Sequence, residues 1–193
     1  MRRSGLLALV TLLAAASAAS CGRAKTPEEA YRRLAAAVTA GDGGALFDSL
    51  HQPARWAWMS VQKWHREAYD IVLSNYPEPE REREKRRFEP AATATSAREL
   101  FKADAAPRAL ATLRPLLSVP GATRFLAAPS GTDAIAVLPS GVRLPFANAG
   151  HGGWGYAGLD AEAEDQKMRA YHDLEVVRAN AADYERAASR SSK

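Results

Sequence analysis

Hydrophobic residues recur at helical spacing through the first half of the chain. The first such segment begins at Thr26, which is followed by Pro27 and Glu29. This is the pattern of a helix start, because the hydroxyl caps free backbone N–H groups and the glutamate completes the capping box. Apolar residues then stand three or four positions apart: Tyr31, Leu34 and Val38. Gly41 ends this helix, and Asp-Gly-Gly over 42–44 predicts a turn.

Four more helices are predicted before residue 118, over 45–50, about 53–75, 96–101 and 107–117. In the longest of them, six residues form one apolar stripe that predicts burial: Trp56, Met59, Trp64, Ala68, Ile71 and Val72. Three others widen the stripe: Trp58, Val61 and Tyr69. An apolar surface of this width indicates packing on more than one side of the helix.

The segment between the helix predicted to end near residue 75 and the helix predicted to begin at residue 96 is charged and contains several prolines. Pro77 and Pro79 interrupt the helical pattern, and 80–87 then alternates acidic with basic residues. Because the two signs balance, the segment is not a basic patch, and it is predicted to be a solvated helix end or a loop. Residues 90–95 are predicted to be a linker.

After Gly121 the pattern changes to short apolar runs separated by turn residues. Strands are predicted over 122–127, 133–138, 142–146 and 154–159, and together they predict an antiparallel meander of three or four strands. Pro145 favours an edge position or a bulge for its strand, because proline cannot donate a hydrogen bond to a sheet.

A long helix is predicted over 160–189, with a length of roughly 45 Å. Its apolar residues recur every three or four positions: Met168, Tyr171, Leu174, Val177, Ala181, Tyr184 and Ala188. The first half is expected to pack on the domain, while the alanine-rich second half is weakly apolar and open to a partner. The predicted fold class is therefore α+β, with N-terminal helices (26–118) packed on a small antiparallel sheet (122–159) and a long C-terminal helix, in a single domain over 26–189.

Residues 1–20 have the order of an export signal. Arg2 and Arg3 precede an apolar run over 6–16, followed by small residues. The run is about a dozen residues, whereas a membrane-spanning helix needs about 20. Residues 18–21 (AASC) resemble a bacterial lipobox, which implies that Cys21 is diacylglycerol-modified and palmitoylated and that 21–25 form a lipidated tether. Ordinary cleavage after 16–18 is the alternative.

Composition agrees with a lipidated, exported chain. Cys21 is the only cysteine, so no intrachain disulfide can form, and acylation would consume a thiol that is otherwise prone to oxidation. The formal net charge of +4 includes Arg2 and Arg3, which leave with the signal, so neither charge nor export favours a nucleic-acid partner. In lipoproteins that resemble this chain, a residue such as Gly22 after the cysteine implies the outer membrane, facing the periplasm.

Two stretches resemble the nuclear transport factor 2-like, or SnoaL-like, cone-fold superfamily. They are Thr26 to Leu50, with its capped helix and Gly-Asp turn, and Val142 to Leu159, with its Gly-Trp hairpin. The resemblance implies a curved sheet that wraps round helices and encloses a pocket. Some cone-fold enzymes use an aspartate base with tyrosine donors, and the candidates here are Asp48, Tyr31, Tyr69 and Tyr156. No spacing singles them out, and no catalytic residue is predicted.

Trp56, Trp58 and Trp64 form the most suggestive cluster of side chains. Trp56 and Trp64 are eight residues apart, which is core spacing, and core burial is the first interpretation. Exposed tryptophans also stack on sugars or peptides, so all three, with Tyr156, are candidate ligand contacts. The histidines at 51, 65, 151 and 172 match no metal-binding spacing, and no metal or cofactor is predicted.

These observations predict a non-catalytic envelope lipoprotein that acts as a binding or accessory module. The alternative is a small-molecule carrier or sensor with a cone-fold pocket, and a cone-fold enzyme comes third. The expected partners are the membrane, through the lipid anchor, and an envelope protein or a small apolar ligand. The oligomeric state stays open.

Overall fold

The computed structural model describes residues 23–191, so the predicted signal peptide and Cys21 lie outside the described residues. The elements in chain order are α1 (Pro27–Ala40), α2 (Gly43–Ser49), α3 (Gln52–Asn75), α4 (Glu80–Thr93), α5 (Ala97–Asp104), α6 (Ala106–Leu117), β1 (Arg124–Ala127), β2 (Asp133–Val137), β3 (Arg143–Asn148), the 3-10 turn η1 (Gly150–Gly152), β4 (Trp154–Tyr156) and α7 (Asp160–Ser191). The predicted α+β class is confirmed, including the long C-terminal helix.

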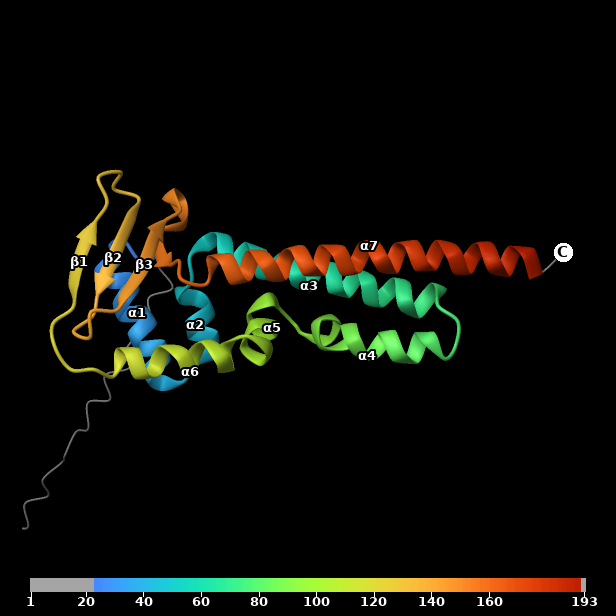
Figure 1. Ribbon diagram of the computed structural model, residues 1–193, viewed down its shortest axis with the longest axis horizontal. Helices are drawn as coiled ribbons and strands as arrows, with labels where there is room; N and C mark the ends of the chain where they lie inside the picture. The colour runs from blue at the N-terminus through green and yellow to red at the C-terminus, as the bar shows by residue number, and fades with distance from the viewer. Residues whose placement is uncertain (1–22, 192–193) are drawn as a thin grey trace, which may run out of the picture.

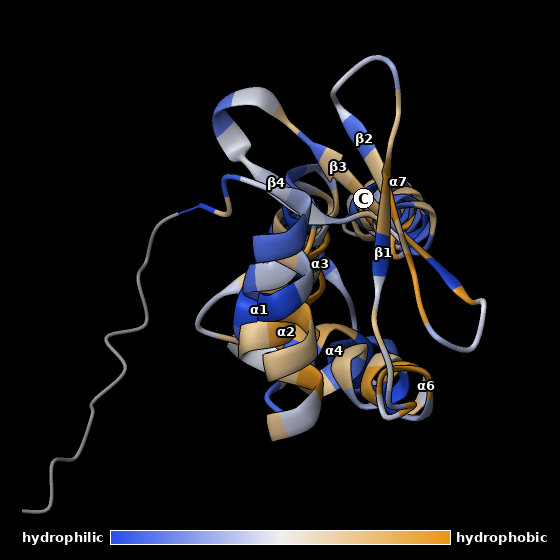
Figure 2. Ribbon diagram, turned by 90° about the vertical axis from the view of Figure 1, so that its left-hand side faces the viewer, coloured by the Kyte–Doolittle hydropathy of each residue, from blue (hydrophilic) through white to orange (hydrophobic). Residues whose placement is uncertain are grey.

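Two regions are distinguishable in Figure 1. The head consists of the sheet with α1, α2, α5 and α6, and the arm consists of α3, α4 and α7. Helices α3 and α7 run side by side in the same direction, because His51 pairs with Asp160 at their starts and Asn75 with Glu185 near their ends. Seen along the arm, α7 appears end-on behind the sheet (Figure 2).

Each region has its own buried cluster. The head core gathers large side chains from α1, α2, α5 and β3, and its most buried members include Leu34, Leu46, Phe101 and Phe146. The arm core is smaller and consists of Ala68, Val72, Tyr76, Phe88, Leu174, Val177 and Ala181. Trp64 packs against both clusters, at the junction of head and arm.

The sheet is the predicted antiparallel meander, in the order β1-β2-β3-β4. Its outer strand β4 is extended by the N-terminal segment, because Ala24 forms an antiparallel bridge with Trp154. Of the two alternatives predicted for Pro145, an edge position or a bulge, the edge position is wrong, since β3 lies between β2 and β4. The carbonyl of Pro145 accepts the N–H of Ala157, beyond the end of β4, so its missing N–H lies where regular pairing has already stopped.

The ends of α1 follow the prediction. The Thr26 hydroxyl accepts the N–H of Glu29 at 3.2 Å, and Gly41 closes the helix with a φ of 67°. The Glu29 carboxylate accepts the N–H of Lys25 at 2.8 Å, one residue before the position a standard capping box would use.

The predicted turn over 42–44 is instead the start of α2. Asp42 is the cap, and its carboxylate accepts the N–H groups of Gly44 and Ala45. A Cβ atom on Gly43 would lie 2.7 Å from the Cβ of Ala106, so the glycine permits α2 to approach α6 closely. The glycines predicted to form a turn therefore lie where α2 packs closely against its neighbours.

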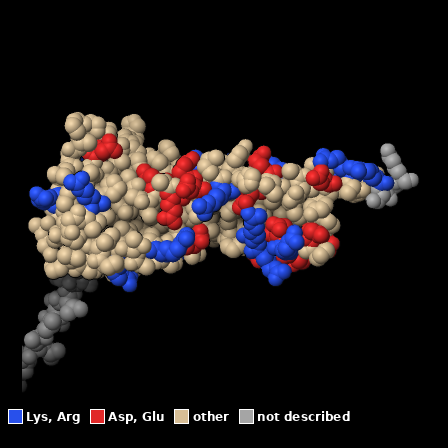
Figure 3. Space-filling view, viewed as in Figure 1, with Lys and Arg blue, Asp and Glu red and all other residues tan. Residues whose placement is uncertain are grey.

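The predicted linker over 90–95 is also wrong in its first part, because α4 continues to Thr93. Phe88 and Ala91 of α4 are buried, and the side-chain amide of Gln62 on α3 donates to the carbonyl of Ala94 at 2.8 Å. Burial against α3 thus stabilises a helix that has Pro90 in its interior and few apolar residues of its own. Figure 3 shows that acidic and basic side chains alternate along this part of the molecule.

The predicted buried stripe of α3 is partly wrong. Trp56 and Met59 are 58% and 56% exposed. Ala68 and Val72 of that stripe are buried as predicted, and so are Trp58 and Val61, which were predicted to widen it. The other buried residues of α3 are Ala54 and Ala57. On α7, Met168 and Tyr171 of the predicted stripe are likewise exposed, at 53% and 44%. Each helix carries more apolar surface than its neighbouring helices cover. The spacing of apolar residues in the sequence does not determine which stripe those neighbours bury.

Candidate functional site

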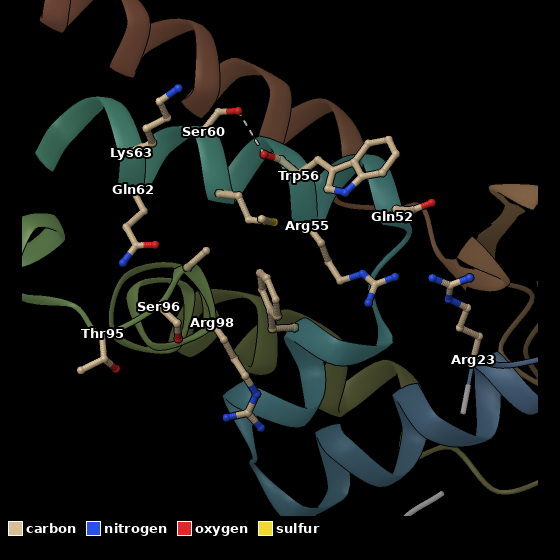
Figure 4. A pocket seen from close by; sticks show the side chains of 13 residues that line it. Arg23, Gln52, Arg55, Trp56, Ser60, Gln62, Lys63, Thr95, Ser96 and Arg98 are labelled. Atoms are coloured by element: carbon tan, nitrogen blue, oxygen red, sulfur yellow. Dashed lines mark hydrogen bonds between the residues drawn. The ribbon is translucent and has the colours of Figure 1, made fainter. Parts of the chain in front are cut away.

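An open groove of about 700 Å³ lies between α3 and the start of α5, bordered by α2 and by the N-terminal segment (Figure 4). We call it the basic groove. Three large apolar side chains line it: Phe47, Trp56 and Met59. Four cationic side chains line it as well: Arg23, Arg55, Lys63 and Arg98. None of the described residues that line the groove is acidic.

Helix α3 supplies most of the groove because of its spacing. Arg55, Met59 and Lys63 are separated by four residues each, so they stand above one another on one helix face, with Trp56 beside them. The opposite wall begins at Ser96, whose hydroxyl caps α5 by accepting the N–H of Glu99 at 3.3 Å. This cap places Arg98 in the first turn of α5, across from α3 (Figure 4).

The cations of the groove differ in how they are paired. Arg98 donates from Nε to Asp48 at 3.1 Å, and this hydrogen bond raises the pKa of its guanidinium. Arg55 is half-buried, and its Nε is buried without a hydrogen-bond partner among the described residues. Burial lowers the pKa of Arg55, Asp48 raises it, and the nearby positive charge of Arg23 lowers it further. Arg55 is thus a partly buried cation that forms no ion pair among the described residues.

A second hollow, of about 400 Å³, lies on the other side of the N-terminal segment. It is lined by Arg23, Lys25, His151, Trp154 and residues of the η1 turn. The side-chain oxygen of Asn148, which also lines this hollow, is buried and has no hydrogen-bond partner within residues 23–191. Basic side chains therefore flank both sides of the point where the chain enters the fold.

The four candidate ligand contacts do not lie together. Trp56 lines the basic groove and is exposed. Trp58 is buried against Phe101, with ring centroids 5.4 Å apart. Trp64 packs on Tyr171 at 5.3 Å, and Tyr156 is buried beside Phe146 at 5.8 Å. Only Trp56 is placed where a ligand could reach it in this groove.

The candidates drawn from the cone-fold resemblance are also dispersed. Asp48 is exposed and pairs with Arg98 on α5. Tyr31 lies between α1 and the sheet, where its ring contacts Phe125 and its hydroxyl accepts from Thr123 at 3.1 Å. Tyr69 packs at the edge of the arm core. The ring of Tyr31 meets those of Phe125 and Phe146 where α1 faces the strands.

The basic residues of the groove are those that sequence reasoning missed. They stand at 23, 55, 63 and 98, so no local run of charge announces them. The signal within one segment is the eight-residue spacing of Arg55 and Lys63 on the helix that also carries Trp56. Reading that helix for a mixed cationic and aromatic face would have found half of the site.

A histidine–carboxylate pair joins the starts of α3 and α7. His51 Nδ1 lies 2.7 Å from Asp160 Oδ2, while His51 Nε2 and Asp160 Oδ1 are buried without hydrogen-bond partners among the described residues. The backbone of β4 approaches closely here, because a Cβ on Gly155 would lie 2.6 Å from the Cα of His51. His51 lines neither hollow described above, and its contact with Asp160 links the residue before α3 to the start of α7.

A second histidine predicts a pH dependence of stability. Burial lowers the pKa of His65 from its ordinary value of 6.5, Asp173 raises it, and Arg87 lowers it. Below pH 6.5 the unfolded chain binds a proton before the folded chain does. The free energy of unfolding is therefore expected to fall as the pH drops through 6.5. The fall ends at a pH low enough to protonate His65 in the folded protein as well.

Denaturant melts across this range, compared with those of His65→Gln, measure the effect. The variant should lose this part of the pH dependence. His172→Gln, at an exposed position of α7, is the matched control and should retain it. A His65→Gln protein whose stability still falls as steeply as that of the parent would contradict the assignment.

Within residues 23–191, no cluster of three or more His, Cys, Asp and Glu side chains is arranged to hold a metal ion. None of the helices in this range is long and apolar enough to span a bilayer. Comparison of the chain with protein-family models, with curated proteins and with solved structures found no significant match.

Proposed function

We propose that this chain is a non-catalytic, lipid-anchored module of the bacterial envelope, which binds a ligand or partner at the basic groove. The observation that carries the proposal is the composition of that groove: the exposed Trp56 lines it together with four cations, of which only Arg98 forms an ion pair among the described residues. Exposed Trp56 next to Arg55 supplies both apolar contact and charge, which is typical of binding surfaces. The lipobox resemblance supports export and anchoring through Cys21.

The same proposal gives the protein a periplasmic location, with the anchor in the outer membrane. Gly22 after the cysteine supports that choice by resemblance to other lipoproteins. The head is proposed to be a cone-fold relative, supported by the capped α1 packing on an antiparallel meander. Because Tyr31, Phe125 and Phe146 fill the space between α1 and the strands, binding is assigned to the groove on the outside of the head.

Metabolic labelling with a palmitate analogue tests the anchor. The parent protein should carry the label and sediment with membranes, and Cys21→Ser should lose both properties. Ser20→Ala is the matched control, because it keeps a small residue before the cysteine and should be labelled like the parent. An unlabelled parent that is recovered soluble, after cleavage following Ala18, would refute the anchored form of the proposal.

Native mass spectrometry of protein recovered gently from envelopes tests binding. A retained anionic mass, absent from Arg55→Gln protein, is the expected result. A mass retained equally by that variant would place the binding elsewhere in the molecule.

A further inference from the structure

Only Gly22 separates the proposed anchor from a residue that lines the groove. Arg23 lines the groove, and Cys21 is only two residues before it. A chain extends at most about 3.6 Å per residue, so the Cα of Cys21 can lie no more than about 7 Å from that of Arg23. This inference rests on the anchoring proposed above, because the distance matters only if Cys21 carries acyl chains.

The segment after the anchor is held firmly to the head. The carbonyl of Ala24 accepts the N–H of Trp154 at 2.9 Å, and Ala24 is only 4% exposed. A Cβ on Gly153 would lie 2.8 Å from that carbonyl, which shows how closely the two segments pack. The head therefore cannot swing away on a long tether, and the edge of the groove at Arg23 is kept close to the lipid headgroups.

The charges of the groove match an anionic headgroup. Arg23 and Arg55 face each other from two different segments (Figure 4), and neither they nor Lys63 forms an ion pair among the described residues. Two guanidinium groups at one site repel each other unless an anion lies between them. A phosphate offers several acceptor oxygens to such donors. On the far side of the N-terminal segment, Lys25 adds a further cation.

The apolar part of the groove matches the region below the headgroups. Trp56 and Met59 are more than half exposed and adjoin the cations on α3. Tryptophan is enriched at membrane–water interfaces, because its ring is apolar while its N–H remains hydrated. An exposed Trp and Met within reach of a bilayer can contact glycerol and the upper acyl carbons.

We propose that the basic groove holds the phosphate of an anionic phospholipid from the same membrane that carries the anchor, with Trp56 and Met59 against its acyl region. The bound lipid would orient the head on the bilayer, because it adds a second point of attachment beside Cys21. It would also hold the arm in a defined direction relative to the membrane, since α3 forms both the groove and the arm.

Vesicle flotation of unacylated protein that begins at Gly22 tests this proposal. Every contact of the described fold lies within residues 23–191, so this chain retains them all. Binding is expected to vesicles of phosphatidylcholine mixed with phosphatidylglycerol, and not to phosphatidylcholine alone. Each lost cation near such a surface weakens binding about fivefold, so Arg55→Gln/Lys63→Gln should weaken it on the order of tenfold or more.

The matched control is Arg124→Gln/Arg143→Gln, which removes the same charge from exposed positions of the sheet outside the groove. It should bind almost as well as the parent. Trp56→Ala should bind the mixed vesicles more weakly while it melts like the parent, which keeps the test valid if the arginine variant folds poorly. A tryptophan quencher placed in the upper acyl region should affect the parent more than Trp56→Ala.

Three results would overturn the proposal. Binding that the control double variant loses as strongly as the groove variant would show a general charge effect. The absence of binding to either vesicle would remove the lipid site. Calorimetric binding of free glycerol 3-phosphate without vesicle binding would assign the groove to a soluble anion. Each can occur while the palmitate label on Cys21 persists, so failure here is distinguishable from failure of the anchor.

Discussion

Trp58→Ala is expected to lower the free energy of unfolding by about 3–5 kcal/mol, the range for truncating a large aromatic residue in a core. Trp58 is only 3% exposed and meets Phe101 edge-on, with ring centroids 5.4 Å apart. It joins α3 to α5 inside the head core, and alanine would leave a cavity that the neighbouring helices can close only in part.

Trp56→Ala is the matched control, two residues earlier on the same helix. Trp56 is 58% exposed, so its loss should change the free energy of unfolding by less than about 0.5 kcal/mol. Denaturant melts of both variants, followed by circular dichroism, measure the difference. Equal losses at the two positions would show that the buried face of α3 is assigned incorrectly.

Phe88→Ala is expected to cost a similar amount, about 3–5 kcal/mol, with its effect concentrated in the arm. Phe88 has no exposed surface, and its ring meets that of His65 at 5.5 Å. It is the buried residue that α4 contributes to the small arm core, whereas Ala91 of the same helix belongs to the head core. Without it, the ion pairs of α4 remain, but exposed pairs stabilise a helix by only about 0.3–0.5 kcal/mol each.

Hydrogen exchange followed by mass spectrometry is the measurement. Amides of α4 should lose protection in Phe88→Ala, while those of α1 and the sheet keep theirs, because no residue of α1 or the sheet belongs to the arm core. Leu73→Ala, at a position 39% exposed on α3, is the control and should leave α4 protected. A uniform rise in exchange across the head would show instead that the head and the arm unfold as one unit.

The ends of several elements could be predicted because short-range hydrogen bonds decide them. Thr26 and Ser96 cap their helices through the backbone N–H three residues later, and Gly41 adopts the left-handed conformation that ends α1. The strands of the meander were found for the same reason, since turn residues separate short alternating segments. In each case the residues that interact are close neighbours in sequence.

The extent of α4 and the buried face of α3 could not be read in this way. Residues 80–93 lack an apolar pattern of their own, and the helix depends on Phe88 and Ala91 packing against α3. Helix α3 carries two apolar stripes. Its packing against α5 and α7 determines that Trp58 is buried while Trp56 is exposed. The groove has the same origin, because Arg23, Arg55 and Arg98 come from three distant segments.

The sequence alone predicts the fold class, the capped starts of α1 and α5 and the glycine that ends α1, because these depend on local hydrogen bonding and on periodic burial. It also carries the lipobox pattern, which is a local signal and stays a prediction. Only the tertiary structure decided which apolar stripe became core and which cations share a groove. Those outcomes depend on contacts between segments far apart in the chain, and such contacts leave no local pattern.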